Sequence, residues 1–176
     1  MCRSAHGRLC AGLAVAVACG LAAASPAAAA GCPGASASAA NAGTAKLRNA
    51  LLCVLNNKRA SHGLRALKVD RRIQRAAGRH ARDMERHHYF AHQRPGGPDL
   101  TTRLHRAGWH GHAWGETIAY GCGPLGSPRA TVRAWMNSPP HRAIILSGTY
   151  RHGGVGVTDT APCGAGGIWV LDVGRK

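Results

Sequence analysis

The hydrophobic pattern of this chain changes from a helical period in its first part to short strand-like runs near its end. Leu47, Leu51 and Leu55 recur on one helix face, whereas residues 153–158 and 168–173 are short runs rich in valine and isoleucine. Because helices and strands bury their apolar faces by packing in layers, this order predicts an α+β fold. We expect helices over residues 44–61, from Asp70 to about His88, over 99–107, and starting at 127–128 and 138–139; strands are expected within 109–120 and at 153–158 and 168–173.

The stretch WMNSPPHRAIIL at residues 135–146 is the segment around which we expect the rest to be organised. Ser138 is a good helix N-cap, and Pro139 fits the first helical position, where no backbone N–H is needed. This pattern places His141 near the start of a short helix. The apolar residues 144–146 at its end are expected to be buried, which would hold His141 over a cleft.

The first thirty residues have the pattern of a secretory signal peptide. Arg3 and Arg8 precede an apolar run over residues 9–24, and three alanines at 28–30 form a small-residue cleavage site. A lipoprotein anchor at Cys19 is the less favoured alternative, because Ala16 stands where such signals usually carry leucine. We therefore expect a signal peptide at 1–30 cleaved near Ala30, a flexible arm at 31–43, and a secreted domain at 44–176 without a transmembrane span.

The composition is strongly basic. The formal net charge is +16, and +14 remains without the two arginines of the signal peptide, which holds no acidic residue. Such a charge favours anionic partners, such as cell-envelope components or lipids, although a solvated arginine-rich surface is the favoured explanation of it. No nucleic-acid-binding motif accompanies the charge, so dedicated nucleic-acid binding is not expected. We expect a monomer.

Four cysteines remain after the signal peptide. In an exported domain this number indicates two disulfides. We favour the pairs Cys32–Cys53 and Cys122–Cys163, of which the first would attach the arm to the first helix and the second would join two glycine-rich loops. A zinc cluster is less favoured, because none of the four cysteines belongs to a Cys-x-x-Cys pair.

Several stretches together resemble the CAP superfamily, also called SCP/PR-1-like. They are FAHQRP around His92, WGETIAYG around Glu116 and WMNSPPHRAIIL around His141, followed by a GVG that starts thirteen residues after His141. The resemblance implies a three-layer α-β-α sandwich with a small central sheet and an open cleft. In many members two histidines and two acids line this cleft and can hold a divalent metal such as zinc.

Matching the motifs places His92 and His141 at the two histidine positions and Glu116 at one acid position. The second acid position falls on Ser138, and no Asp or Glu occurs between Thr117 and Thr158. The cleft set is therefore His92, Glu116, His141 and Ser138, with His92 and His141 as candidate metal ligands and Glu116 as the candidate catalytic group.

These residues leave several functions open. The favoured hypothesis is a non-enzymatic extracellular binding module of undefined activity. One alternative is a metal-dependent, peptidase-like hydrolase in which Glu116 is the base; another is a lipid or sterol carrier. The cleft trio of His92, Glu116 and His141 could also be a purely structural hydrogen-bond network. A buried, hydrogen-bonded role is expected for His80, which lies on the apolar face of its helix.

Overall fold

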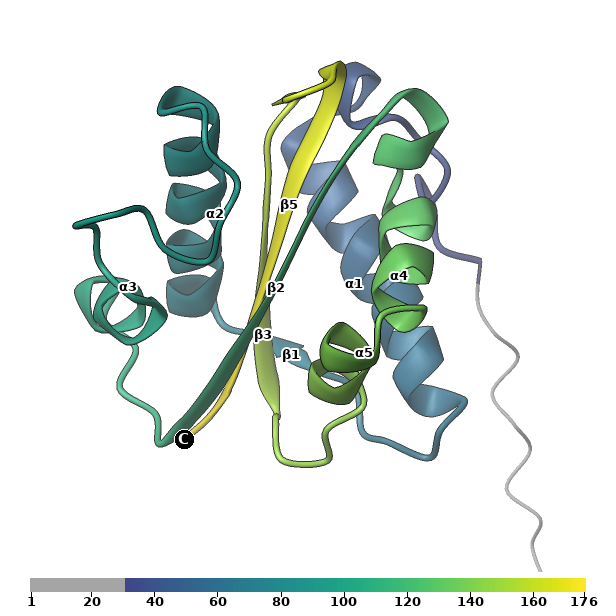
Figure 1. The fold of residues 1–176 in the computed structure, drawn as a ribbon. Coiled ribbons are helices and arrows are strands. Elements are labelled where there is room, and N and C mark those ends of the chain that lie inside the picture. Colours follow the sequence, from purple (N-terminus) through teal and green to yellow (C-terminus); the bar gives the residue numbers. More distant parts are fainter. Residues whose placement is uncertain (1–30) are drawn as a thin grey trace, which may run out of the picture.

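The structure is a computed structural model that describes residues 31–176; the predicted signal peptide and Cys19 lie outside the described residues. It is a three-layer sandwich in which a sheet separates two helical layers (Figure 1). The helices are α1 (Thr44–Ala60), α2 (Arg71–Arg86), α3 (Leu100–Arg106), α4 (Pro128–Met136) and α5 (Pro139–Ile145), with 3-10 turns η1 (Ala39–Asn41) and η2 (Gly123–Gly126); the strands are β1 (Lys68–Val69), β2 (Ala113–Cys122), β3 (His152–Val157), β4 (Thr160–Ala161) and β5 (Gly164–Arg175).

The sheet has the strand order β1-β3-β5-β2, and β4 pairs with the start of β5. Only the β1–β3 pair is parallel. The long β5 lies between β3 and β2, which pair with its two edges, and it is buried from Gly166 to Gly174. In the β2–β5 ladder Glu116 is opposite Asp172. The α+β sandwich predicted from the sequence is therefore confirmed.

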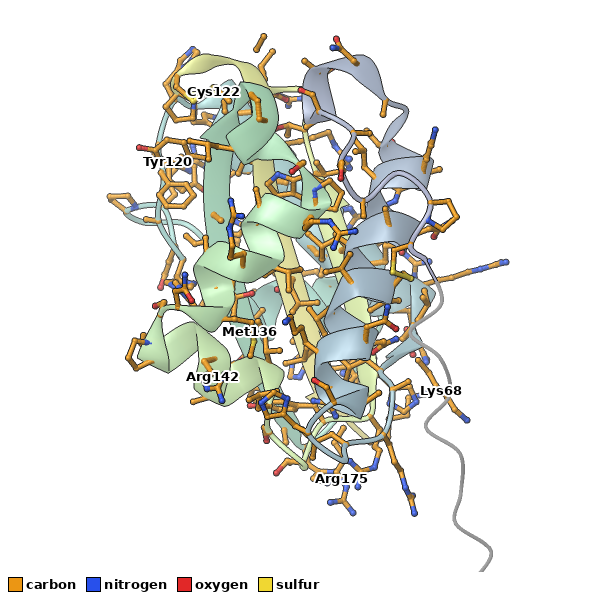
Figure 2. The ribbon with its side chains drawn as sticks, turned by 90° about the vertical axis from the view of Figure 1, so that its right-hand side faces the viewer. Lys68, Tyr120, Cys122, Met136, Arg142 and Arg175 are labelled. Atoms are coloured by element: carbon orange, nitrogen blue, oxygen red, sulfur yellow. A yellow bond between two sulfur atoms is a disulfide. The ribbon has the colours of Figure 1, made fainter. Side chains whose placement is uncertain are left out.

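Each face of the sheet packs against its own helical layer. Helices α1, α4 and α5 cover one face, with α1 and α4 side by side (Figure 2), and α2 and α3 cover the other. Because side chains alternate along a strand, Trp169, Leu171 and Val173 of β5 enter the first core, whereas Ile168 and Val170 enter the second.

The glycines of β3 let α2 approach the sheet closely. A Cβ at Gly154 would lie 2.2 Å from the backbone nitrogen of Gln74, and one at Gly156 would lie 2.2 Å from the carbonyl oxygen of Ala77. Between and beyond them, Val155 and Val157 face the opposite core. The GVG motif therefore has a packing reason, since at Gly154 and Gly156 no side chain separates β3 from the backbone of α2.

Helices α2, α3 and α4 begin where the sequence predicts, whereas the predicted cap at Ser138 needs a correction. The side chains of Asp70, Asp99 and Ser127 accept hydrogen bonds from the first turns of α2, α3 and α4. The Ser138 hydroxyl makes no such bond; instead its carbonyl oxygen accepts from the Arg142 N–H at 2.8 Å. The reason is local, because prolines occupy the first two positions of α5 and leave few free N–H groups for a capping side chain. Helix α2 also ends at Arg86, two residues earlier than predicted.

The segment before α1 is packed against the domain, which corrects the expected flexible arm. Ala39 is fully buried and Ala35 is 3% exposed, both within the core that α1 and α4 share. The Ala35 carbonyl accepts from the Arg129 N–H at 2.8 Å. Small side chains allow this close approach, and a disulfide from Cys32 to Cys53 of α1 holds the segment in place.

Both predicted disulfides are present. Cys32 pairs with Cys53 and Cys122 pairs with Cys163, with Cα–Cα distances of 5.7 and 6.0 Å. The second pair joins the end of β2 to the turn before β5. Among residues 31–176, no helix combines the length and the apolar character that crossing a bilayer requires.

Candidate functional site

The candidate cleft residues come from three elements on different sides of the fold. Glu116 lies on β2, His92 on the loop between α2 and α3, and His141 in the first turn of α5. The Glu116 side chain is only 3% exposed, whereas that of His92 is 58% exposed. The structure therefore places a buried acid beneath an accessible imidazole.

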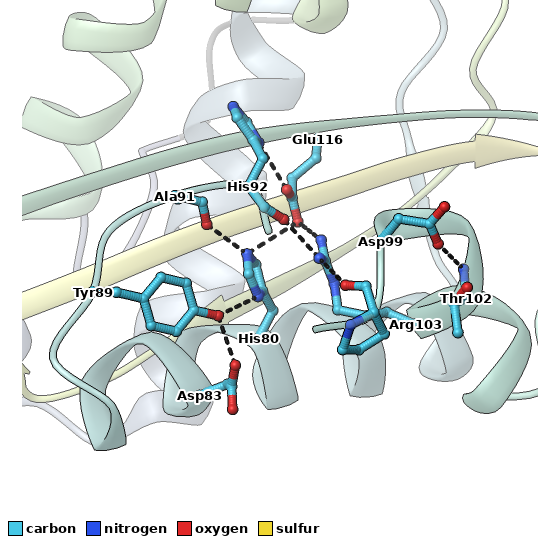
Figure 3. Close-up of polar contacts among 10 residues, drawn as sticks. His80, Asp83, Tyr89, Ala91, His92, Asp99, Thr102, Arg103 and Glu116 are labelled. Carbon is cyan, nitrogen blue, oxygen red and sulfur yellow. Dashed lines mark hydrogen bonds and ion pairs between the residues drawn. The ribbon is translucent and has the colours of Figure 1, made fainter. Parts of the chain in front are cut away.

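Both carboxylate oxygens of Glu116 have cationic or hydrogen-bonding partners (Figure 3). Oε1 accepts a hydrogen bond of 2.8 Å from His92 Nδ1, and Oε2 accepts one from an Nη2–H of Arg103. His80 Nε2 lies 3.8 Å from the same Oε2. Burial alone would raise the pKa of Glu116, but the bond from His92 and the positive charge of Arg103 outweigh it and lower the pKa, so the group stays ionised.

Arg103 is a site residue that the sequence did not reveal. Its side chain is 8% exposed, and Nη1 donates to the His92 carbonyl at 2.7 Å and to the Pro98 carbonyl at 3.4 Å. One guanidinium thus neutralises Glu116 and holds the loop that carries His92. The chain contains so many arginines that the sequence does not single out Arg103. The available signal for its burial is its position next to Leu104 on the inner face of α3.

His80 has the buried role expected from its place on α2. It is 2% exposed, and its Nε2–H donates to the Ala91 carbonyl at 3.1 Å. Burial lowers the pKa of His80, which keeps the ring neutral. Its Nδ1 lies 3.5 Å from the Tyr89 hydroxyl, which donates to Asp83 at 2.6 Å. The chain of contacts from Glu116 to Asp83 fixes the loop from below.

A second acid, Asp172, lies next to Glu116 and was also missed. It is fully buried, and neither carboxyl oxygen accepts a hydrogen bond from a donor among residues 31–176. Burial, and next the negative charge of Glu116, raise the pKa of Asp172 well above its ordinary value, which favours the protonated carboxyl. The signal was present in the sequence as one acidic residue inside the apolar run IWVLDV, which follows the acid-free interval 117–158.

His141 lies near His92 but is not joined to the Glu116 network. Burial, and next the positive charge of His92, lower the pKa of His141, so its ring is neutral when His92 is charged. The hydrogen bond to Glu116 raises the pKa of His92. Within the described part of the chain, neither the His141 ring nor the Ser138 hydroxyl has a side-chain hydrogen bond. The structure thus pairs His92 with Glu116, brings His141 within electrostatic range, and leaves Ser138 at the edge.

This donor set does not form a complete metal centre. No group of three or more His, Cys, Asp or Glu side chains in residues 31–176 is arranged to hold a metal ion. His92 and His141 supply two imidazoles, whereas catalytic zinc usually has three protein ligands. Glu116 would have to give up Arg103 or His92 to become the third. The positive charge of Arg103 beside it further disfavours a cation there.

Comparison with known proteins identifies the family. The profile of the Cysteine-rich secretory protein family (CAP) matches residues 52–173, and this chain therefore belongs to the CAP family. It is 33% identical over 114 residues to the uncharacterized protein YkwD of Bacillus subtilis (strain 168), which covers 65% of this chain and 41% of YkwD. It is 36% identical over 109 residues to the uncharacterized membrane protein YlbC of the same organism, covering 61% of this chain and 30% of YlbC.

Solved structures agree with this assignment. An extracellular protein containing an SCP domain from Bacillus anthracis superposes with a TM-score of 0.68 at 27% identity, over 76% of this chain and 41% of that one. An outer surface protein from Borrelia burgdorferi shares the fold, with a TM-score of 0.63 at 21% identity over 72% of this chain and 90% of that one. This chain spans less than half of the length of both Bacillus subtilis proteins.

Proposed function

We propose that this CAP-domain protein is an extracellular binding module that uses the cleft of His92 and His141 without catalytic turnover. The observation that carries the proposal is the state of Glu116. Its side chain is 3% exposed and both oxygens already accept hydrogen bonds, from His92 and Arg103. A general base needs a free oxygen within reach of the proton that it removes. Glu116 instead supports the cleft from within.

The chemistry of the cleft suits an anionic or hydrogen-bonding ligand. The raised pKa of His92 favours its imidazolium form, and the lowered pKa of His141 favours a neutral ring. The pair therefore offers a charged donor beside a group that can donate or accept. The net charge of +14 that remains without the signal peptide adds general attraction to anionic cell-envelope components.

Export of the protein is part of the proposal. Two disulfides are typical of proteins that fold in an oxidising compartment, and a structural relative from Bacillus anthracis is an extracellular protein. The predicted signal peptide at residues 1–30 is consistent with this compartment. N-terminal sequencing of protein recovered from the culture medium would test it, with a mature end near residue 31 expected.

A sedimentation assay with isolated cell walls tests the binding function. We expect the protein to bind walls that carry anionic polymers, less strongly at higher salt because surface charges are screened. His92→Ala and His141→Ala should each weaken binding several-fold. His112→Ala is the matched control, because His112 is exposed, is not one of the candidate cleft residues and makes no side-chain hydrogen bond or ion pair with another residue in 31–176. Equal binding by all three variants would refute a role of the cleft.

Calorimetric titration with zinc tests the competing hydrolase hypothesis. The cleft offers two imidazoles, and Glu116 raises the pKa of one of them, His92, so that this ring keeps its proton more readily. We therefore expect weak zinc binding that becomes weaker as the pH falls. Micromolar or tighter binding that disappears in both His92→Ala and His141→Ala would contradict the proposal. So would hydrolysis of cell-wall peptides that is abolished by a chelator and by Glu116→Gln. Extraction of a stoichiometric lipid from purified protein would favour the carrier hypothesis instead.

A further inference from the structure

A second hollow lies behind the Glu116 network, between α2, α3 and the loop that joins them. Its volume is about 250 Å³, and its lining includes Arg79 and Asp83 of α2, Arg94 of the loop, and Arg103 and Arg106 of α3. Arg103 and His80 separate it from the histidine cleft, because both contact Glu116 and both line the hollow. We call it the arginine pocket.

The arginine pocket carries more positive charge than the protein itself balances. Arg103 is neutralised by Glu116. Asp83, the single acidic residue in the lining, already accepts from the Tyr89 hydroxyl and lies 3.8 Å from Arg94 Nε. Arg79 and Arg106 are exposed and make no ion pair or side-chain hydrogen bond with any residue in 31–176. Two positive charges at the rim therefore lack a protein counter-ion.

The wall of the arginine pocket also contains donors without acceptors. The Nε atoms of Arg94 and Arg103 are buried and have no hydrogen-bond partner among the described residues. The Arg103 side chain as a whole is 92% buried, since 8% of it is exposed. Buried donors nearly always have partners, because leaving one unpaired costs free energy. An anion in the pocket would offer an acceptor to these Nε–H groups.

The basic surface continues beyond the pocket along α2. A neighbouring hollow of about 230 Å³ shares Arg79 and Asp83 with the arginine pocket and adds Arg82 and Arg86. Arg79, Arg82 and Arg86 follow one another at helical spacings of three and four residues, so they lie on one face of α2. A ligand with an anionic group in the pocket can therefore extend over a surface of the same sign.

We propose that the arginine pocket is a binding site for a terminal phosphate group, either inorganic phosphate or the phosphomonoester headgroup of an anionic lipid. Arginine guanidinium groups match the geometry of phosphate oxygens, with parallel N–H donors. A phosphate monoester carries up to two negative charges at neutral pH, which equals the two rim charges of Arg79 and Arg106, whereas a carboxylate would balance only one. This site is separate from the histidine cleft and goes beyond the function proposed above.

Titration of the ¹⁵N-labelled protein with inorganic phosphate, followed by the Arg Nε–H resonances, tests the site directly. We expect the resonances of Arg94 and Arg103 to shift with a single saturable curve at constant ionic strength. Arg79→Ala and Arg106→Ala should each weaken phosphate binding about tenfold. Arg133→Ala is the matched control, because Arg133 is an exposed residue of α4 in the opposite helical layer and its replacement removes the same charge. Arg103 is not substituted, because it also holds Glu116.

Two further arms separate the sources of the phosphate and the two proposed sites. Phosphatidic acid vesicles, compared with neutral phosphatidylcholine vesicles, report on a lipid headgroup; phosphate binding without vesicle binding assigns the pocket to a soluble ligand. His141→Ala, which leaves the Glu116 network intact, should leave phosphate binding unchanged, and this result would keep the pocket distinct from the pair of histidines. The proposal is wrong if phosphate produces no saturable shift, if Arg133→Ala weakens binding as much as Arg106→Ala, or if the protein binds anionic vesicles but not inorganic phosphate.

Discussion

Replacing Arg59 with methionine should destabilise the protein strongly, although Arg59 lies outside both proposed sites. Arg59 of α1 is fully buried. Its guanidinium donates to the carbonyls of Arg65 at 2.9 Å, Ile145 at 2.6 Å and Ser147 at 3.0 Å, with a longer contact of 3.4 Å to that of Tyr150. A single side chain thus holds the end of α5 and the loop that follows it.

The magnitude follows from these contacts. Methionine keeps the apolar stem but leaves the carbonyls of Arg65, Ile145 and Ser147 without this donor; the Ile145 bond is buried and the other two are partly buried, at about 1 kcal/mol each. Removing a buried positive charge that has no carboxylate partner offsets part of this loss. We therefore expect the free energy of unfolding to fall by about 3 kcal/mol. With a urea dependence of about 1.5 kcal/mol/M, the midpoint of unfolding would drop by about 2 M.

Urea unfolding followed by far-UV circular dichroism, with the disulfides intact, measures this change. Lys58→Met is the matched control, because Lys58 is the exposed neighbour of Arg59 on the same helix and the substitution removes the same charge. It should stay within about 0.5 kcal/mol of the unsubstituted protein. A loss below 1 kcal/mol for Arg59→Met would refute the argument that this guanidinium holds the α5 loop.

Other substitutions test the network and the disulfides. Glu116→Gln should lower the free energy of unfolding by about 3 kcal/mol or more, because it leaves Arg103 buried without a counter-ion. Since the pKa of Glu116 is lowered in the folded protein, the difference between the variant and the unsubstituted protein should shrink as the pH falls below 4.5. A difference that stays constant in acid unfolding would contradict this argument. By NMR, the His92 ring should titrate above its ordinary pKa of 6.5, and its pKa should return toward 6.5 in Glu116→Gln. The pairing of His92 with Glu116 therefore stabilises the fold fully below pH 6.5, and this stabilisation is lost as the pH rises through the raised pKa. Replacing Cys122 and Cys163 by alanine opens a loop of 41-residue separation and should cost about 4 kcal/mol in thermal or urea unfolding; no change would show that the loop is held by other contacts.

Local features of the sequence were sufficient to predict the helical layers and their caps. Asp70, Asp99 and Ser127 cap helices where expected, because a cap depends on side-chain and backbone atoms only two or three residues apart. Ser138 departs from the expectation for an equally local reason, the second proline after it. The two disulfide pairs were also predicted correctly, and the family resemblance agrees with the CAP match over residues 52–173.

The tertiary structure decided which charged residues form the sites. Asp172 lies next to Glu116 because β5 pairs antiparallel with β2, a contact between residues 56 positions apart in the sequence. Arg103 and Arg59 look like any other arginine of a basic chain until the fold buries them. The packed segment before α1 is a similar case, since its alanines are buried only where other elements cover them.

The sequence by itself determined the type and order of the elements, the helix caps, and the motifs that carry His92, Glu116 and His141. These features depend on interactions within a few residues, which a pattern along the chain records directly. The buried carboxyl of Asp172 with its raised pKa, the buried Arg103 and the arginine pocket depend on which distant segments pack together. Their charge states follow from burial and from neighbours across the sheet, so the three-dimensional structure alone decided them.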